Sequence, residues 1–215
     1  TLSSSLNIKS VSGNAGYSLI VSNPAPTLNN GTQSQGLNGG DGADIIHGSS
    51  RYENIEGRAG NDIIFGHGGN DVIKGGPGAD YVDVTGGANL QFFQGDSPIV
   101  SVTGSQFYLP NGVDRVVGFG NGSSLWLGND QSMAPALNLI SAPSNGLVTD
   151  QAYFLVRGSY VNSIFSSNST GQDTLLVYDG DPAAAPQPGS TVASPSSGVS
   201  QTAILLSGVT PDQLS

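Results

Sequence analysis

One acidic residue recurs at every ninth position between residues 44 and 80 of this 215-residue chain. Five consecutive blocks carry it, and they read GGDGADIIH, GSSRYENIE, GRAGNDIIF, GHGGNDVIK and GGPGADYVD over residues 39–83. The sixth position holds, in order, Asp44, Glu53, Asp62, Asp71 and Asp80. A glycine-rich turn with one carboxylate and several carbonyls suits a hard cation such as Ca²⁺, which takes ~6–8 oxygen ligands. Since one turn cannot supply that many, two turns must share each ion.

The nine-residue period matches neither a helix nor a single strand, whose periods are ~3.6 and ~2. Six turn-forming residues followed by three extended ones do explain it. The eighth position is β-branched in every block, and we expect its side chain to point inward from Ile46, Ile55, Ile64, Ile73 and Val82. Two blocks per coil then give a flattened right-handed spiral with two short parallel sheets and a thin core.

Two blocks per coil also place turns on the same edge of the spiral 18 residues apart. The first edge is expected to stack the turns that begin at Gly39, Gly57 and Gly75. We expect one ion between Asp44 and Asp62 and a second ion between Asp62 and Asp80.

The second edge stacks the turns that begin at Gly48 and Gly66. We expect a weaker site there, between Glu53 and Asp71, because Arg51 replaces a turn glycine and its cation competes for the site. After residue 83 the repeat phase slips, and residues 84–89 could continue this edge.

The blocks resemble the nonapeptide of the RTX (repeats-in-toxin) family, G-G-x-G-x-D-x-U-x. Blocks 39–47 and 75–83 match every specified position, whereas Arg58 and His67 replace the second glycine of two others. The resemblance implies a parallel β-roll (β-helix) that holds two to four Ca²⁺ ions. It also implies that carbonyls complete the sites, from Gly39, Asp41, Gly57, Ala59, Gly75 and Pro77 on the first edge and from Gly66 and Gly68 on the second.

Composition narrows the classes of partner. The 16 acidic residues exceed the 6 Lys plus Arg, and the net charge of −10 argues against binding to nucleic acid or to anionic membranes. No apolar run is long enough to span a membrane, and the absence of Cys excludes disulfides and Cys-based metal sites. No amino-terminal signal peptide is visible, and since the chain begins with Thr we expect it to be part of a longer protein.

The repeat region is expected to need its ions in order to fold. Stacked turns bring carboxylates together, where partial burial and like charge both disfavour ionisation. A core one residue thick offsets little of the backbone entropy lost on folding. We therefore expect residues 36–96 to be disordered without calcium and to fold on binding it.

The whole chain is expected to be all-β. Residues 1–35 should supply amino-terminal capping strands, and residues 97–215 a β-rich, sandwich-like region with an exposed Pro/Ser-rich loop at 180–200. Within that region 173–179 and 202–208 read as hairpin partners, and Trp126 is expected in the core.

No catalytic constellation stands out. H-E-x-x-H and G-x-S-x-G are absent, so we expect no enzymatic turnover. His47 and His67 belong to blocks whose turns lie on opposite edges, and a shared zinc site is therefore not expected.

The segments "QAYFLVRGSYV", "DTLLVYDGD" and "TAILLSGVTPDQLS" resemble the carboxyl-terminal region that follows such repeats in proteins exported by type I secretion. This implies a secreted or cell-surface location and the secretion machinery as a partner. The leading hypothesis is a non-catalytic calcium-binding module of a secreted bacterial protein of surface-layer, adhesin or toxin type. The alternative is an accessory module of an extracellular metalloprotease, lipase or polysaccharide epimerase. Calcium-dependent self-assembly would favour the first hypothesis, and binding of an anionic glycan the second.

Overall fold

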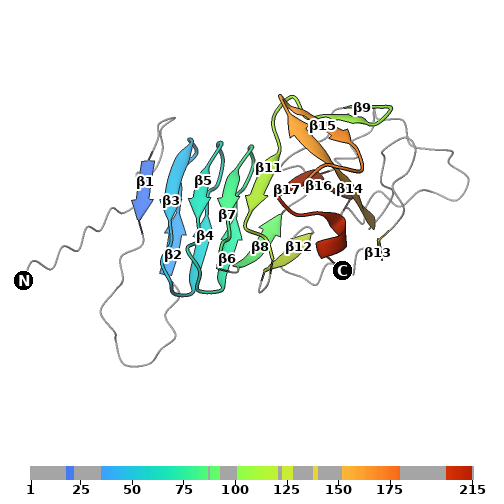
Figure 1. Cartoon of the computed structure of the whole chain (residues 1–215). Coiled ribbons are helices and arrows are strands. Elements are labelled where there is room, and N and C mark those ends of the chain that lie inside the picture. The colour runs from blue at the N-terminus through green and yellow to red at the C-terminus, as the bar shows by residue number, and fades with distance from the viewer. Residues whose placement is uncertain are drawn as a thin grey trace, which may run out of the picture. The chain divides into compact units, whose positions relative to one another are not determined.

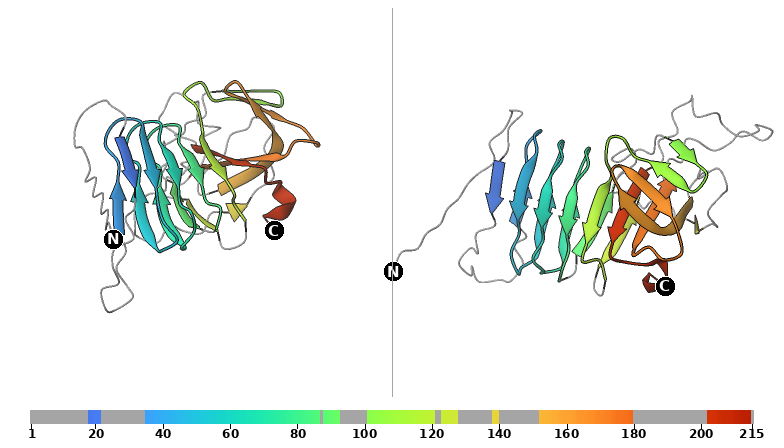
Figure 2. Two further views of the ribbon diagram at one scale, coloured as in Figure 1. Left: turned by 60° about the vertical axis from the view of Figure 1, so that its left-hand side comes forward. Right: turned by 45° about the horizontal axis from the view of Figure 1, so that its top comes forward.

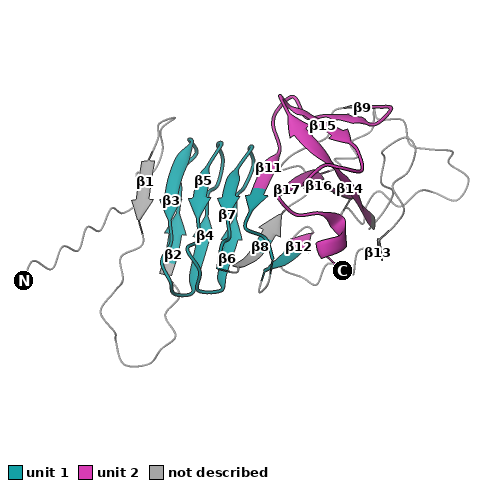
Figure 3. Cartoon of the chain, in the orientation of Figure 1, with its two compact units in different colours: residues 1–91, 116–125 teal, residues 92–115, 126–215 magenta. Residues whose placement is uncertain are grey.

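The computed structural model describes residues 18–21, 35–86, 88–92, 101–120, 123–127, 138–139, 152–179 and 202–214. The described elements are strands and one short 3₁₀ helix, so the all-β prediction is confirmed (Figure 1). The chain divides into two compact units, which Figure 3 colours separately. Unit 1 comprises residues 1–91 and 116–125, and unit 2 comprises residues 92–115 and 126–215.

Unit 1 contains two rows of short strands, whose regular stacking can be followed in Figure 2. The first row begins with β1 (Ser18–Val21), β3 (Asp44–His47), β5 (Ile63–Phe65) and β7 (Tyr81–Asp83), paired in that order and parallel. The second row contains β2 (Gln35–Asn38), β4 (Glu53–Glu56), β6 (Asp71–Lys74) and β8 (Ala88–Phe92), also parallel. Successive blocks therefore alternate between rows, which confirms a parallel β-roll with two blocks per coil.

Strand register places the eighth position of each block in the interior. Ile46 pairs with Ile64, and Ile64 with Val82, in the first row. Where side-chain burial is described, the interior positions of β2 to β8 are at most 7% exposed; they are Leu37, Ile46, Ile55, Ile64, Ile73, Val82 and Leu90. This stack is the thin core that the repeat predicts.

The coil continues past the last full block with one residue fewer. Ile73 pairs with Leu90, a step of 17 residues in place of 18, and the Gly66 N–H donates to the Asp83 carbonyl at 2.9 Å. The structure thus explains the slip in sequence phase after Asp83. One turn residue is missing and Ala88 pairs with Asp71, so this rung of the second edge has no acid.

The strands β11 (Asp114–Val117) and β12 (Ser124–Leu127) follow along the chain. Within unit 1, the Val84 N–H donates to the Val117 carbonyl at 2.9 Å. Trp126, expected in the core, is 65% exposed, so that expectation is wrong. Its strand pairs at the end of the second row, where the outward position has solvent beside it.

Unit 2 contains an antiparallel arrangement in the order β17-β16-β14-β15-β10-β9. The strand bounds are β9 (Ser101–Thr103), β10 (Gln106–Tyr108), β13 (Asn138–Leu139), β14 (Ala152–Val161), β15 (Ile164–Ser167), β16 (Asp173–Asp179) and β17 (Thr202–Ser207). β16 and β17 are antiparallel partners, as the sequence predicts. Their buried side chains pack with aromatic residues of this unit, among them Phe107, Phe154 and Phe165.

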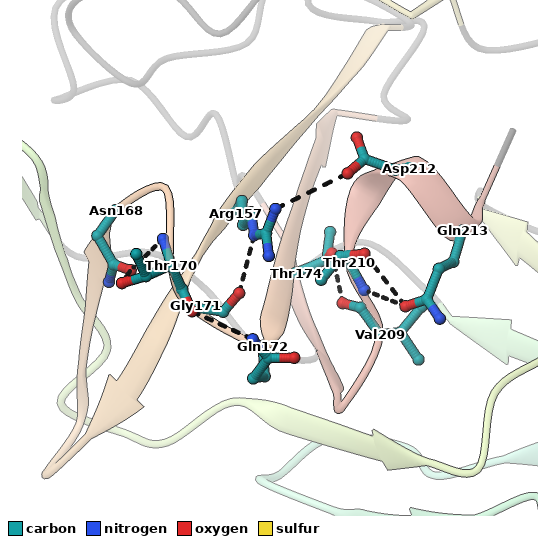
Figure 4. Close-up of polar contacts among 10 residues, drawn as sticks. All are labelled: Arg157, Asn168, Thr170, Gly171, Gln172, Thr174, Val209, Thr210, Asp212 and Gln213. Atoms are coloured by element: carbon teal, nitrogen blue, oxygen red, sulfur yellow. Dashed lines mark hydrogen bonds and ion pairs between the residues drawn. The ribbon is translucent and has the colours of Figure 1, made fainter.

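The carboxyl-terminal segment is tied to the sheet of unit 2 by polar contacts (Figure 4). The Thr174 hydroxyl donates to the Val209 carbonyl at 2.7 Å, and Arg157 lies 3.8 Å from the Asp212 carboxylate. The short helix η2 (Pro211–Gln213) begins with a capping box, in which the Thr210 N–H donates to the Gln213 side chain at 2.8 Å. The segment is therefore an ordered part of unit 2.

Two expectations fall outside the described residues, namely the exposed loop at 180–200 and capping strands within 1–17 and 22–34. Among the residues that the structure does describe, no helix has the length and apolar character needed to cross a bilayer.

Candidate metal centre

Hydrogen bonds between coils join the repeated acids into ladders. On the first edge, the Asp44 N–H donates to Asp62 Oδ1 and the Asp62 N–H to Asp80 Oδ1, each at 2.8 Å. On the second edge, the Glu53 N–H donates to Asp71 Oδ1 at 2.8 Å. All five side chains are at most 1% exposed. The 18-residue spacing thus brings together the acids that the sequence assigns to each edge.

Two buried carboxylate oxygens in these ladders, Asp62 Oδ2 and Asp71 Oδ2, have no hydrogen-bond partner. A buried oxygen in this state carries its full desolvation cost, which is about 1–3 kcal/mol and more for a charged group. Such atoms in a folded protein call for an explanation, and a bound ion is one. The protein alone therefore does not satisfy these two buried oxygens of the ladders.

The first glycine of a block forms the floor of an oxygen-lined space. A methyl group built on Gly57 would lie 2.5 Å from the Gly75 carbonyl oxygen and would overlap Asp62 Oδ2. The same construction on Gly39 would overlap Asp44 Oδ2 and the Gly57 carbonyl oxygen. Carboxylate and carbonyl oxygens from adjacent coils thus converge where glycine leaves room.

The second edge differs in ways that the sequence did not reveal. Ser49 occupies both oxygens of Glu53: its N–H donates to Oε2 at 3.0 Å and its hydroxyl contacts Oε1. Next to Gly66 the nearest carbonyl oxygen belongs to Asp83, 3.5 Å from a methyl position. The space beside Gly66 is therefore less crowded with oxygens than the space beside Gly57. In the sequence, the only sign of the contact with Glu53 is that Ser49 occupies the second position of its block, where the repeat has glycine.

The other sequence-predicted ligands take varied positions. Asp41 and Pro77 are exposed, Ala59 is half-buried, and Gly66, Gly68 and Gly75 are buried. The Pro77 carbonyl accepts the Gly60 N–H at 3.0 Å, and the Gly66 carbonyl lies 2.6 Å from a methyl position on Gly48. The exposed Arg51 presents its carbonyl to Gly69 in the adjacent coil.

Burial alters the acidity of the two ladder acids with an unpartnered oxygen. It raises the pKa of Asp62 to about 6, with a smaller rise from the charge of Asp44, although the Asp44 N–H lowers it. Burial likewise raises the pKa of Asp71 to about 7, where the Glu53 N–H lowers it and the Glu53 side chain raises it. Without a cation, half of the Asp62 carboxyls keep their proton at a pH of about 6 and half of the Asp71 carboxyls at about 7.

Metal-free protein should therefore become more ordered as the pH falls. Both carboxyls bind protons more tightly in the folded state than at their ordinary pKa of 3.8. Their contribution to stability is then complete below pH ~4 and is lost as the pH rises through 6 to 7. Circular dichroism of dialysed, metal-free protein should show more β structure at pH 5 than at pH 8. An Asp62→Asn/Asp71→Asn double variant should flatten this dependence, and order that increases with pH would contradict the argument.

Although the turns of their blocks lie on opposite edges, the structure brings the two histidine side chains together. His47 Nδ1 lies 3.1 Å from His67 Nε2. The ninth position ends a strand, so it adjoins the turn of the opposite edge and not the turn of its own block. The Phe65 ring stacks on His47 with centroids 4.7 Å apart, which extends the contact along the outside of the roll.

The donor set fits calcium. Among the described residues, no cluster of three or more His, Cys, Asp or Glu side chains is present. A site on either edge must thus combine one or two carboxylates with backbone carbonyls, and oxygen-only ligands are what Ca²⁺ prefers. Asp62, with the carbonyl of Gly75 beside it, would hold an ion on the first edge, and Asp71 would hold one on the second edge. The ion would supply positive charge to carboxylates that otherwise repel one another.

Comparison with known proteins agrees with this chemistry. Residues 37–50 and 53–90, about a quarter of the chain, match the family model of the RTX calcium-binding nonapeptide repeat in four copies. The searches of curated proteins and of solved structures yield no match. The chain therefore carries a calcium-binding module of RTX nonapeptide repeats within residues 37–90.

Proposed function

We propose that this chain is a non-catalytic module of a secreted bacterial protein, one that stays unfolded at low calcium and folds when it meets calcium outside the cell. The observation that carries the proposal is the ladder of buried carboxylates, in which Asp62 Oδ2 and Asp71 Oδ2 lack hydrogen-bond partners. A folded roll with these atoms ionised and bare is disfavoured, and a cation between turns removes the penalty.

Ion binding and folding of the roll are one reaction in this proposal. Each site draws on two coils, so it does not exist until both coils are formed, and its binding free energy is folding free energy. The ion count follows from the ladders: two ions on the first edge and one on the second. Extracellular modules of this chemistry typically bind calcium at ~0.1–1 mM.

The parent protein is proposed to be of surface-layer, adhesin or toxin type, exported by type I secretion. Support comes from the RTX repeats, and from the resemblance of residues 151–215 to the carboxyl-terminal region of such substrates. Calcium-dependent folding suits this route, because an unfolded acidic chain can thread through a channel and fold after release.

Calcium removal should unfold the roll. When EGTA is added to full-length protein at pH 7.5, the β signal in circular dichroism should fall by most of what the strands within residues 35–92 contribute. Excess calcium should restore it. Magnesium is the control ion, because it demands tighter octahedral geometry and dehydrates reluctantly. An unchanged β spectrum and unchanged protease resistance after chelation would contradict calcium-dependent folding.

Export has a separate test. Co-expression with a type I secretion apparatus should deliver the chain to the medium, and a variant ending at residue 201 should remain in the cell. Equal export of both variants would contradict the secretion proposal without affecting the calcium proposal.

A further inference from the structure

The two histidines form a contact that the calcium chemistry does not use. His47 ends β3 and His67 lies in the turn after β5, so the two residues belong to successive coils of the roll. His47 Nδ1 and His67 Nε2 are 3.1 Å apart. The chain has two His and no Cys, so these rings contain all of its imidazole nitrogen.

Phe65 lies beside both histidine rings. Phe65 stacks on His47 with an interplanar angle of 11°, and its centroid lies 6.0 Å from that of the His67 ring. His67 has a φ of 64°, at the position where Gly76 has 110° in a block that matches the repeat fully. The turn imposes this conformation, which Arg58 also adopts at the same block position with a φ of 80°, so glycine fits at position 67 without strain.

We propose that His47 Nδ1 and His67 Nε2 bind one divalent transition-metal ion, Cu²⁺, Ni²⁺ or Zn²⁺, which joins successive coils of the roll. Metal–imidazole bonds are about 2.0–2.1 Å long, so two nitrogens at roughly 90–110° on one ion lie about 2.9–3.4 Å apart. The observed separation falls in this interval.

The rings need one adjustment to admit the ion. They are nearly parallel, at 15°, with centroids 5.4 Å apart, which suits a hydrogen bond between the two nitrogens. The ion replaces this bond: the nitrogen that carries the proton loses it while the other nitrogen of the same ring gains one through solvent. His67 is exposed, so its ring is free to tilt.

The ligands at the histidine pair determine which metal ion it prefers. Among the described residues no third His, Cys, Asp or Glu joins a cluster with the pair, so water completes the coordination. Imidazole favours Cu²⁺ over Ni²⁺ and Zn²⁺, whereas Ca²⁺ favours oxygen. The ion at the histidines and the calcium ions of the edges therefore select different ligands and do not compete.

Electron paramagnetic resonance of Cu²⁺ tests the proposal, because hyperfine coupling counts the imidazole nitrogens on the ion. Full-length protein with saturating calcium, titrated with CuCl₂, should bind one Cu²⁺ through two imidazole nitrogens. His47→Gln and His67→Gly should each show one nitrogen and bind at least about tenfold more weakly, because losing a ligand costs no less than losing a group that supports one.

His67→Gly serves as the matched variant because glycine adopts the observed φ without strain. It should fold at least as well as the unmodified chain in calcium, as circular dichroism would show. NiCl₂ should raise the thermal midpoint of the unmodified chain and leave that of His67→Gly unchanged. A single coordinated nitrogen in the unmodified chain, or equal Cu²⁺ affinity in all three proteins, would overturn the proposal. Neither result bears on calcium binding.

Discussion

Asp62→Asn should remove two calcium ions from the folded protein, whereas Asp71→Asn should remove one. Asp62 occupies the middle of the first-edge ladder, where Asp44 donates to its carboxylate and its own N–H donates to Asp80. An ion on either side of Asp62 needs its charge. Asp71 shares its edge with Glu53, and its next rung holds Ala88.

The expected magnitudes follow from linkage between binding and folding. At free calcium 100 times the dissociation constant, each lost site removes about 2.7 kcal/mol of stability. Asp62→Asn should thus cost roughly twice as much as Asp71→Asn. Calcium titration calorimetry and urea unfolding at fixed calcium measure both quantities. The substitutions are sterically equal, so each is the control for the other, and equal calcium loss from both would mean that the ladders do not define the sites.

Gly57→Ala should abolish one of the two first-edge sites, the one beside Asp62 and the Gly75 carbonyl, although it adds a single methyl group. That methyl would overlap Asp62 Oδ2 and lie 2.5 Å from the Gly75 carbonyl oxygen, two atoms from different coils that a site requires. Overpacking costs about 1–3 kcal/mol, and the lost site adds about 2.7 kcal/mol at the calcium level given above.

Gly66→Ala is the matched control for this change. Its methyl would have Asp71 Oδ2 and Ile73 Cδ1 as its nearest neighbours, both at 3.2 Å, so shifts of a few tenths of an ångström relieve it. We expect a loss of about 1 kcal/mol or less. Thermal unfolding in calcium measures the difference, and similar losses from the two variants would show that the space beside Gly57 is not special.

The repeat period alone predicted much of unit 1. Glycine, the acid and the β-branched residue recur in phase, and a strict nine-residue period leaves few ways to bury Ile46, Ile55 and Ile64 together. The 18-residue spacing predicted which acids share an edge. The hydrogen bonds from the Asp44 N–H to Asp62 and from the Asp62 N–H to Asp80 agree with that prediction.

Features that depend on side-chain contacts between coils could not be predicted in the same way. The bond from Ser49 to Glu53 needs the turn conformation, and the contact of His47 with His67 spans 20 residues from unequal block positions. The turn before Leu90 is one residue shorter than the others, and only the strand register, in which Ile73 pairs with Leu90, reveals this. Trp126 was misplaced because hydrophobicity alone does not say which strand ends a sheet.

The alternation of blocks between two rows limits how such a chain can change its length. Insertion or deletion of 18 residues adds or removes a whole coil and leaves every later block in its own row, with its acid on its own edge. Insertion of nine residues between Lys74 and Gly75 moves every later strand to the opposite row, so that Asp80 would meet Asp71 in place of Asp62. We therefore expect the roll to lengthen by duplication of two repeats at a time, although the sequence repeat is a single block of nine residues.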